Sequence, residues 1–518
     1  MGIFITYFSS LQLWLLIAAA ASIGLSAMAH IRHKDSLAIT LLFLSALLIY
    51  SFAALLDPFL NIWDERFHAL VARNLMAHPM KPTLYDDPVM AMDYDNWTIY
   101  HVWLHKQPLF LWQIGASFKL FGISEFSLRI PNILMGALLV VVSVRTARLL
   151  TDRTTAWLSG VMVLTTVYLL EMVGGRQDMD HNDVAFMFYI SLSIWALTEY
   201  HFDGNRRWLF LIGVFAGMAL LCKWLVGLLV YLGWGVLRLS ARRFRFRENI
   251  DLLAALGLTF AVALPWQVYT FIAFPDEALN AMLANARHFT EPMDGQAGPW
   301  WFHFARFPLI YGQWSVWFIG PALLVLWVRF SDRSMALAWM IMIAGVYLFF
   351  SLAVTKMGSF TVILLMPVSI AFAALLKEII SLSQQWITPR FKAVAFGLAV
   401  LALILLRFDV EGLQEKHTLW KEENQYSRML MHNREVFISL DLPKNTVLCN
   451  VKGRHYVEAM FYTGLPAYRM VPDAQQYLDL REKNRVVALF RIQDQQIPDY
   501  LLNDSTVILL DEVLQGYE

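Results

Sequence analysis

Acidic residues beside long apolar runs are the first places where this sequence could do chemistry. Asp64 and Glu65 follow the second apolar run, within the stretch Trp63-Asp64-Glu65-Arg66. A carboxylate there could orient an acceptor group or take its proton as a general base. The same pair would also stabilise the start of a following helix, because carboxylates are favoured at helix N-termini. Both interpretations stay open from the residues alone.

The densest polar stretch runs from Gly174 to Asp183 and joins two apolar runs. It holds three carboxylates and a histidine: Asp178, Asp180, His181 and Asp183. These groups could orient a sugar hydroxyl or bind a divalent cation, for which Glu65, Asp180 and His181 are the candidate ligands. Their spacing fits no compact metal motif, so no cofactor is assigned and a metal ion is left open. The alternative is a polar hairpin in which Asn182 or Asp183 caps the next helix.

Cationic side chains recur in similar positions and could bind a phosphate. Lys106 lies in His105-Lys106-Gln107-Pro108-Leu109, just before a predicted helix start, a place that suits a lipid phosphate. The other candidates for phosphate binding are Lys223, Arg287, His288 and Lys356. Each could instead be an ordinary anchor at the membrane surface.

The elements that position these groups are apolar and long. The chain has 518 residues, of which 58% are hydrophobic and only 16% charged, and its mean hydropathy is +0.50; soluble domains carry about 25% charged residues. Charge-free runs cover 37–56, 252–275, 307–328, 334–355 and 357–376, and about 20 apolar residues suffice to cross a bilayer. The sequence therefore predicts a polytopic α-helical membrane protein. The net charge of zero argues against a nucleic-acid partner.

Alternation of basic and other connections predicts the topology. About twelve spans are expected, at 9–29, 37–56, 131–150, 156–173, 184–201, 208–222, 224–238, 251–271, 312–328, 335–353, 361–377 and 393–406. Six short connections are rich in Lys and Arg and should face the cytoplasm; they lie near residues 32–34, 145–153, 206–207, 238–247, 329–333 and 390–392. Both termini and two large loops, 57–130 and 272–311, then lie outside. All the candidate site residues fall on that outer side.

The composition changes after residue 406. Strand-like runs at 446–451, 486–492 and 506–510 flank a helical pattern around 455–462. We expect a membrane catalytic domain over 1–406 and a small soluble α/β domain over 407–518, outside the membrane.

Taken in order, these stretches resemble the GT-C-type glycosyltransferases of the aminoarabinose-transferase and protein O-mannosyltransferase kind. The resemblance covers about residues 37–400. It rests on Trp63-Asp64-Glu65-Arg66-Phe67, His105-Lys106-Gln107-Pro108-Leu109-Phe110, Phe118-Lys119-Leu120-Phe121-Gly122, Leu128-Arg129-Ile130-Pro131 and the Gly298-Pro299-Trp300-Trp301 loop. The chain departs from the family pattern at Gln107, where proline is frequent, at His288, where arginine is usual, and at Phe360, where tyrosine is expected.

The resemblance implies transfer of a sugar from a polyprenyl-phosphate donor to a lipid, glycan or protein acceptor. It implies a bacterial inner membrane with the active site facing the periplasm. We expect an inverting displacement in which cations, Lys106 first, meet the charge that grows on the leaving phosphate. Asp64 is the first candidate base, and one of Asp178, Asp180 or Asp183 the second.

Two other functions compete. A transporter or flippase for a lipid-linked or anionic solute would explain the many helices and a broken span at Lys223, but it predicts polar groups near the bilayer midplane. A membrane scaffold that displays the C-terminal region would leave the carboxylate clusters unexplained.

Overall fold

The structure is a computed structural model that describes residues 8–91, 97–176, 181–223, 225–240, 246–408, 425–492 and 495–516. The chain forms two compact units. The first consists of 1–56, 106–110 and 129–411, and the second of 57–105, 111–128 and 412–518. We expected the first outer loop to belong with the membrane helices; in the structure its 57–105 part forms one unit with the C-terminal region.

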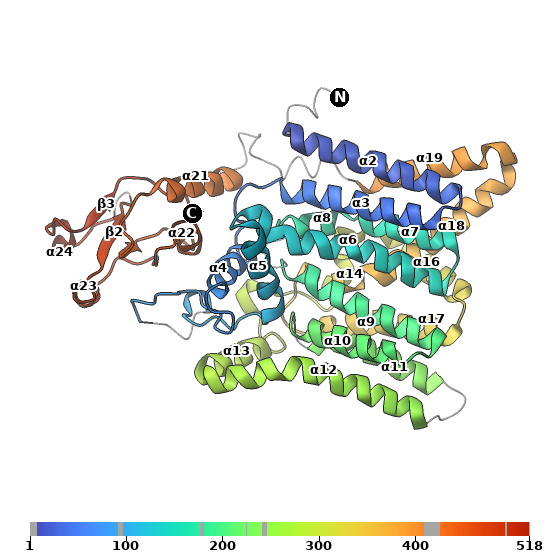
Figure 1. Cartoon of the computed structure of the whole chain (residues 1–518), viewed down its shortest axis with the longest axis horizontal. Helices are drawn as coiled ribbons and strands as arrows, with labels where there is room; N and C mark the ends of the chain where they lie inside the picture. The colour runs from blue at the N-terminus through green and yellow to red at the C-terminus, as the bar shows by residue number, and fades with distance from the viewer. Residues whose placement is uncertain are drawn as a thin grey trace. The chain divides into compact units, whose positions relative to one another are not determined.

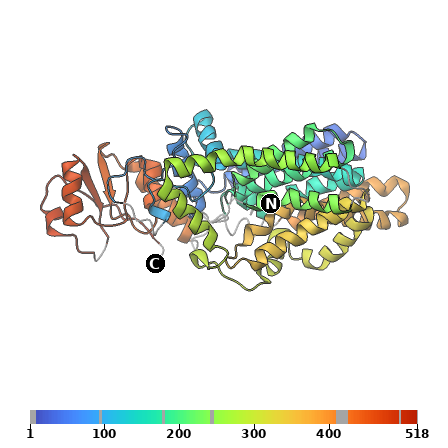
Figure 2. The same cartoon turned by 90° about the horizontal axis from the view of Figure 1, so that it is seen from below.

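The first unit is a bundle of long helices that lie side by side (Figures 1 and 2). The helices are α2 (Ser10–Ile31), α3 (Asp35–Ala54), α6 (Glu125–Leu150, from Arg129 on), α7 (Arg153–Leu164), α8 (Val167–Val173), α9 (Asp183–Asp203), α10 (Arg207–Leu220), α11 (Leu229–Ser240), α12 (Phe246–Ala273), α13 (Pro275–Arg287), α14 (Phe302–Ala305), α15 (Phe307–Tyr311), α16 (Ser315–Arg329), α17 (Arg333–Leu352), α18 (Leu365–Ser383) and α19 (Lys392–Arg407).

Every predicted span coincides with helix in this bundle. By length and composition, seven stretches of the described residues could cross a membrane, or nine if two bent pairs each count as one span. The remaining predicted spans are α9, α10 and α11, so the total of twelve stays a prediction. The chain is an integral membrane protein.

Small and hydroxyl-bearing residues hold the helices close together. Between α2 and α3, Ser22 donates a hydrogen bond to the Leu41 carbonyl at 2.8 Å, and Ser45 donates to the Ala19 carbonyl at 2.9 Å. Between α10 and α12, a Cβ at Gly217 would lie 2.6 Å from the Cβ of Val262. Such close backbone contact is typical of helix packing in membranes.

Arg407, the last residue of α19, joins two breaks in the bundle. The helices α7 and α8 meet at 52°, and the α14–α15 segment meets α16 at 90°. The buried guanidinium of Arg407 donates to the Thr165 and Thr166 hydroxyls at 2.9 and 2.8 Å, and to the Met162 carbonyl at 2.9 Å. It also donates to the Tyr311 carbonyl at 3.4 Å. One cation therefore donates to carbonyls and hydroxyls at both breaks.

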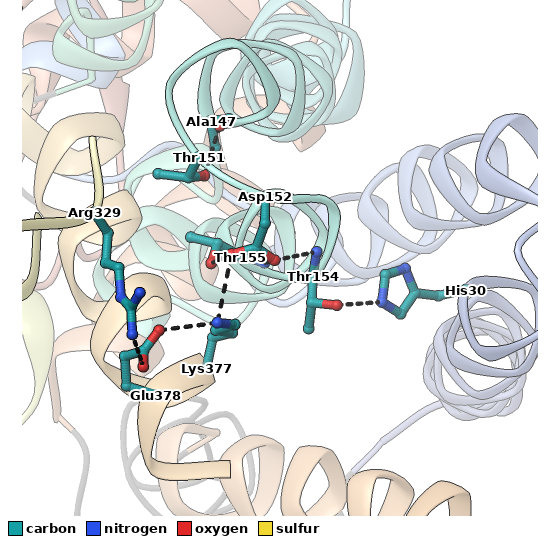
Figure 3. Close-up of polar contacts among 9 residues, drawn as sticks. All are labelled: His30, Ala147, Thr151, Asp152, Thr154, Thr155, Arg329, Lys377 and Glu378. Atoms are coloured by element: carbon teal, nitrogen blue, oxygen red, sulfur yellow. Dashed lines mark hydrogen bonds and ion pairs between the residues drawn. The ribbon is translucent and has the colours of Figure 1, made fainter. Parts of the chain in front are cut away.

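Ion pairs gather at one end of the bundle. Lys377 on α18 lies 4.0 Å from Asp152, which caps the start of α7, and 2.9 Å from Glu378; Glu378 also accepts from Arg329 at 2.6 Å (Figure 3). At the His30 side of this cluster, the Thr154 hydroxyl lies 3.4 Å from the imidazole (Figure 3).

Two further pairs join the predicted basic connections to one another. Arg153 pairs with Asp35, and His201 lies 3.3 Å from Asp332. Connections predicted to share one side of the membrane therefore do lie at one end of the bundle.

The second unit contains a three-stranded parallel sheet in the order β1-β2-β3. The strands are β1 (Thr446–Cys449), β2 (Val486–Phe490) and β3 (Ile508–Leu510), one in each predicted run. Thr446 pairs with Val486, and Ala488 with Ile508. The helices of this part of the chain are α4 (Asp64–Leu75), α5 (Pro108–Phe121, from Leu111 on), α21 (Gln425–Ser439), α22 (Tyr456–Thr463), α23 (Ala474–Glu482) and α24 (Asp499–Leu502).

Candidate functional site

A buried ion pair stands at the start of α9, in the first unit. The Lys223 ammonium lies 2.7 Å from one carboxylate oxygen of Asp183, and the Ser359 hydroxyl donates to the other oxygen at 2.7 Å. The Asp183 side chain is only 2% exposed, whereas Lys223 is 29% exposed. The pair therefore presents a positive charge to its surroundings and keeps its negative charge inside.

An aromatic ring, that of Phe360, lies against the Lys223 ammonium. Its nitrogen lies 4.9 Å from the centre of the Phe360 ring, within the range of a cation–π contact. His303 of α14 is stacked on Phe360, with ring centres 6.1 Å apart. Three separate stretches, those of Lys223, His303 and Phe360, thus form one layered cluster beside Asp183.

The segment around Lys106 joins the same part of the first unit. The Leu109 amide donates to the Leu221 carbonyl at 3.1 Å, and Gln267 of α12 donates to the Gln107 side chain at 2.6 Å. The Phe110 ring meets the imidazole of His181 edge-on, with centres 5.1 Å apart. Gln107, where the family frequently has proline, is thus used for a contact between side chains.

Two buried asparagines complete this neighbourhood. Asn132 of α6 donates to the His181 carbonyl at 3.0 Å, and Asn182 donates to the Cys222 carbonyl at 3.5 Å. They tie the turn before α9 to α6 and to the turn that holds Lys223.

Lys356 occupies a different environment from Lys223. Its ammonium donates to the carbonyls of Phe350, Ser351 and Ala353 at the end of α17, and its side chain is buried. Burial lowers the pKa of Lys356. The three ammonium hydrogens thus satisfy carbonyls that the helix leaves unpaired. The predicted contact between Lys356 and a phosphate remains a prediction.

Arg287 and His288 lie where α13 ends. The His288 carbonyl accepts from the Thr355 amide at 3.0 Å, so this stretch runs beside the one that contains Lys356. The Arg287 side chain is exposed and that of His288 is partly buried. Their roles in phosphate binding likewise remain predictions.

Asp64 and Glu65 open α4 in the second unit, and both are buried. One carboxylate oxygen of Glu65 accepts from the Asn61 amide at 2.7 Å and from the Asn61 side chain at 3.1 Å. Glu65 therefore fixes the turn before α4, and the role of Asp64 as a base remains a prediction.

The remaining predicted residues concern the metal. Asp178 and Asp180 lie outside the described residues. Of the other candidate ligands, Glu65 belongs to the second unit and His181 to the first. Within the part of the chain that the structure describes, no three His, Cys, Asp or Glu side chains come together in a way that could hold a metal ion.

Sequence reasoning placed the stretches of His303 and Ser359 on the outer side but did not link them, or Gln267, to particular partners. Ser359 is 176 residues from Asp183, and no local pattern could have linked them. The presence of an ionisable His303 in an otherwise apolar stretch was the one usable signal.

The fold is similar to that of solved membrane glycosyltransferases. ArnT from Cupriavidus metallidurans, bound to undecaprenyl phosphate, matches with a TM-score of 0.62 and 17% identity over 87% of this chain and 89% of that one. The oligosaccharyltransferase of Archaeoglobus fulgidus in its apo form matches with a TM-score of 0.56 and 13% identity, over 84% of this chain and 65% of the other. At these identities the likeness establishes the fold.

The sequence comparisons agree with the fold. Residues 105–269 match the family described as dolichyl-phosphate-mannose-protein mannosyltransferase. The undecaprenyl phosphate-alpha-4-amino-4-deoxy-L-arabinose arabinosyl transferase of Pseudomonas aeruginosa is 25% identical over 324 residues, 60% of this chain and 56% of that protein. An uncharacterized protein of Aquifex aeolicus is 24% identical over 59% of each chain. The matches thus span little more than half the length of these relatives. The predicted resemblance to GT-C glycosyltransferases is confirmed.

Proposed function

We propose that this chain is a membrane glycosyltransferase that takes a sugar from a polyprenyl-phosphate donor and passes it to a lipid, glycan or protein acceptor. The observation that carries the proposal is the Asp183–Lys223 pair, which lies inside residues 105–269 that match the mannosyltransferase family, with the Phe360 ring beside the ammonium. A relative of similar fold is known with undecaprenyl phosphate bound, and a lipid phosphate of that kind suits a partly exposed ammonium beside an aromatic ring.

In the proposed reaction the acceptor hydroxyl attacks the anomeric carbon of the sugar. The bond between that carbon and the phosphate oxygen breaks, and the phosphate leaves with the electron pair. Lys223, with Lys106, would stabilise the negative charge that develops on the leaving phosphate. Asp183 would act as a positioning residue, because both its oxygens are engaged by Lys223 and Ser359.

Asp64 would take the proton of the acceptor hydroxyl as general base. One base and one leaving-group site favour a single displacement with inversion at the anomeric carbon. No step of this scheme requires a metal ion.

The proposal includes a topology. Twelve spans with both termini outside, an α/β region over 407–518 outside the membrane, and a bacterial inner membrane with the site facing the periplasm agree with the ion pairs gathered at the other end of the bundle. Asp183 opens α9 and Glu199 lies near its other end. Their 16-residue separation corresponds to about 24 Å along a helix, somewhat less than the roughly 30 Å of a hydrocarbon core.

The experiment uses purified protein in liposomes with a panel of radiolabelled polyprenyl-phosphate sugars and a total membrane extract as acceptor. We expect label to move from one donor to an extractable product. Movement of intact donor across the bilayer without transfer would instead identify a flippase.

A further inference from the structure

The stretch that leads into α4 is held by side chains from the C-terminal region of the same unit. The Leu60 amide donates to the hydroxyl of Tyr462 at 3.3 Å, and the Ile62 amide donates to the hydroxyl of Tyr426 at 3.1 Å. Between them, the Asn61 amide donates to Glu65. Three consecutive amides just before Asp64 are thus satisfied by side chains, and two of those come from beyond residue 412.

The other side of Asp64 is held by a buried ionic network. Arg66 lies 3.2 Å from Glu458 of α22, and both side chains are less than 5% exposed. The second oxygen of Glu458 lies 2.7 Å from the imidazole nitrogen Nδ1 of His455. A buried charge left without its partner is costly, so this network fixes the first turn of α4 against α22.

Trp63, the residue before Asp64, has the uncommon backbone φ of +62°. Bulky residues adopt this conformation only where their surroundings impose it. Here the guanidinium of Arg454 stacks over the Trp63 ring at 4.0 Å. The strained residue is therefore held from the same C-terminal region as its neighbours.

The Tyr462 hydroxyl is itself fixed. It donates to Glu125 at 2.9 Å, and Glu125 also pairs with Arg434 of α21 at 2.6 Å. Burial raises the pKa of Tyr462 well above its ordinary value, with a further contribution from Glu125. The hydroxyl stays protonated, donates to Glu125 and accepts from Leu60.

We infer that the region from Tyr426 to Tyr462 is a positioning part of the active site, which sets the place of Asp64 through Tyr426, Arg454, Glu458 and Tyr462. The inference rests on the proposed role of Asp64. It gives the C-terminal region a task in the chemical step, distinct from recognition of an acceptor. None of these four residues needs to touch the substrate.

Two variants test the inference without removing volume. The pair Tyr426→Phe with Tyr462→Phe removes the two acceptors of the Leu60 and Ile62 amides. Glu458→Gln leaves Arg66 without a countercharge. Arg491→Gln is the matched control, because it breaks an exposed ion pair with Asp511 in the same region.

We expect kcat to fall about 100-fold in both variants while KM stays near its wild-type value, since small displacements of a reacting group carry penalties of that order. Hydrogen exchange should quicken at residues 60–65 and stay slow in β1 and β2. The control should match wild type in both measurements. The full-length protein in liposomes is used throughout.

Wild-type kcat in the tyrosine pair, or unchanged exchange at 60–65, would overturn the inference. If Glu458→Gln also loses exchange protection in the sheet, that variant is unfolded more widely, and the result for the Tyr426→Phe with Tyr462→Phe pair decides whether the inference stands. The two proposals fail separately: an active Asp64→Asn protein would remove the proposed base, whereas an inactive Asp64→Asn protein beside fully active tyrosine and Glu458 variants would remove only the positioning role.

Discussion

The Asp183–Lys223 pair allows a prediction whose size follows from the structure. Asp183→Asn keeps the shape of the side chain and removes its charge, so the Lys223 ammonium loses a charge-assisted hydrogen bond of 2.7 Å. Such a bond contributes about 1.5–3 kcal/mol. If its loss is expressed fully in the placement of Lys223, kcat/KM should fall by about 10- to 150-fold.

Removing the Lys223 ammonium should lower both the transfer activity and the stability of the protein. Lys223→Met takes away the proposed phosphate ligand, and we expect a loss of about 10²–10³-fold in transfer. It also leaves the Asp183 carboxylate, 2% exposed, without a countercharge, which should destabilise the protein by about 3–5 kcal/mol. The double variant Asp183→Asn with Lys223→Met should regain stability because no buried charge is left, yet remain as inactive as Lys223→Met.

The assay is label transfer in liposomes, together with thermal unfolding in detergent. Lys119→Met, at an exposed lysine of α5, is the control. Additive losses of activity in the double variant would refute the reasoning, because they would mean that Asp183 acts independently of Lys223.

Three predictions concern the stability of the helix bundle. Arg407→Met should lower the free energy of unfolding by about 3 kcal/mol, because buried carbonyls and hydroxyls at both helix breaks lose their donor. Arg407→Lys should recover part of the lost stability. An Arg407→Met variant with wild-type thermal stability would contradict the stabilising role of Arg407. Gly217→Val should cost about 1–3 kcal/mol by separating α10 from α12, measured by the same unfolding assay, whereas Gly257→Val, which meets no neighbour within 4 Å, should leave this packing intact. Burial opposes ionisation of Asp332, but its hydrogen bonds from Ser334, the Met335 amide and His201 lower its pKa from 3.8 to about 2. Since the unfolded chain then binds more protons between these values, stability should fall as pH drops from about 4 to about 2, and by less in Asp332→Asn; equal pH profiles would exclude this contribution.

The membrane helices could be predicted because hydropathy is a local property. The runs near 20 apolar residues coincide with helix, although 307–328 is broken at 90° between α15 and α16. The spacing of β-prone runs after residue 406 located the three strands of the described sheet. The grouping of the 57–105 stretch with the C-terminal region could not be foreseen, since it depends on contacts such as Arg66 with Glu458, 392 residues apart.

In the candidate site, too, local features could be predicted from the sequence, whereas long-range contacts could not. The sequence itself shows Asp183, Lys223 and Lys356 as ionisable residues beside apolar runs. Their partners were not: Lys223 pairs with a carboxylate, while Lys356 satisfies the carbonyls at the end of its own preceding helix. Only the folded chain separates a cation paired with a buried carboxylate from one that caps a helix.

The central claim is that Asp64 accepts the proton of the acceptor hydroxyl, and label transfer by Asp64→Asn tests it most directly. Wild-type protein and Asp64→Asn would be compared at equal amounts in liposomes, with the donor identified from the panel and hydrogen exchange confirming that both are folded. The account predicts a loss of about 10²–10⁴-fold in kcat with donor binding intact. A folded Asp64→Asn protein that transfers label at the wild-type rate would contradict it.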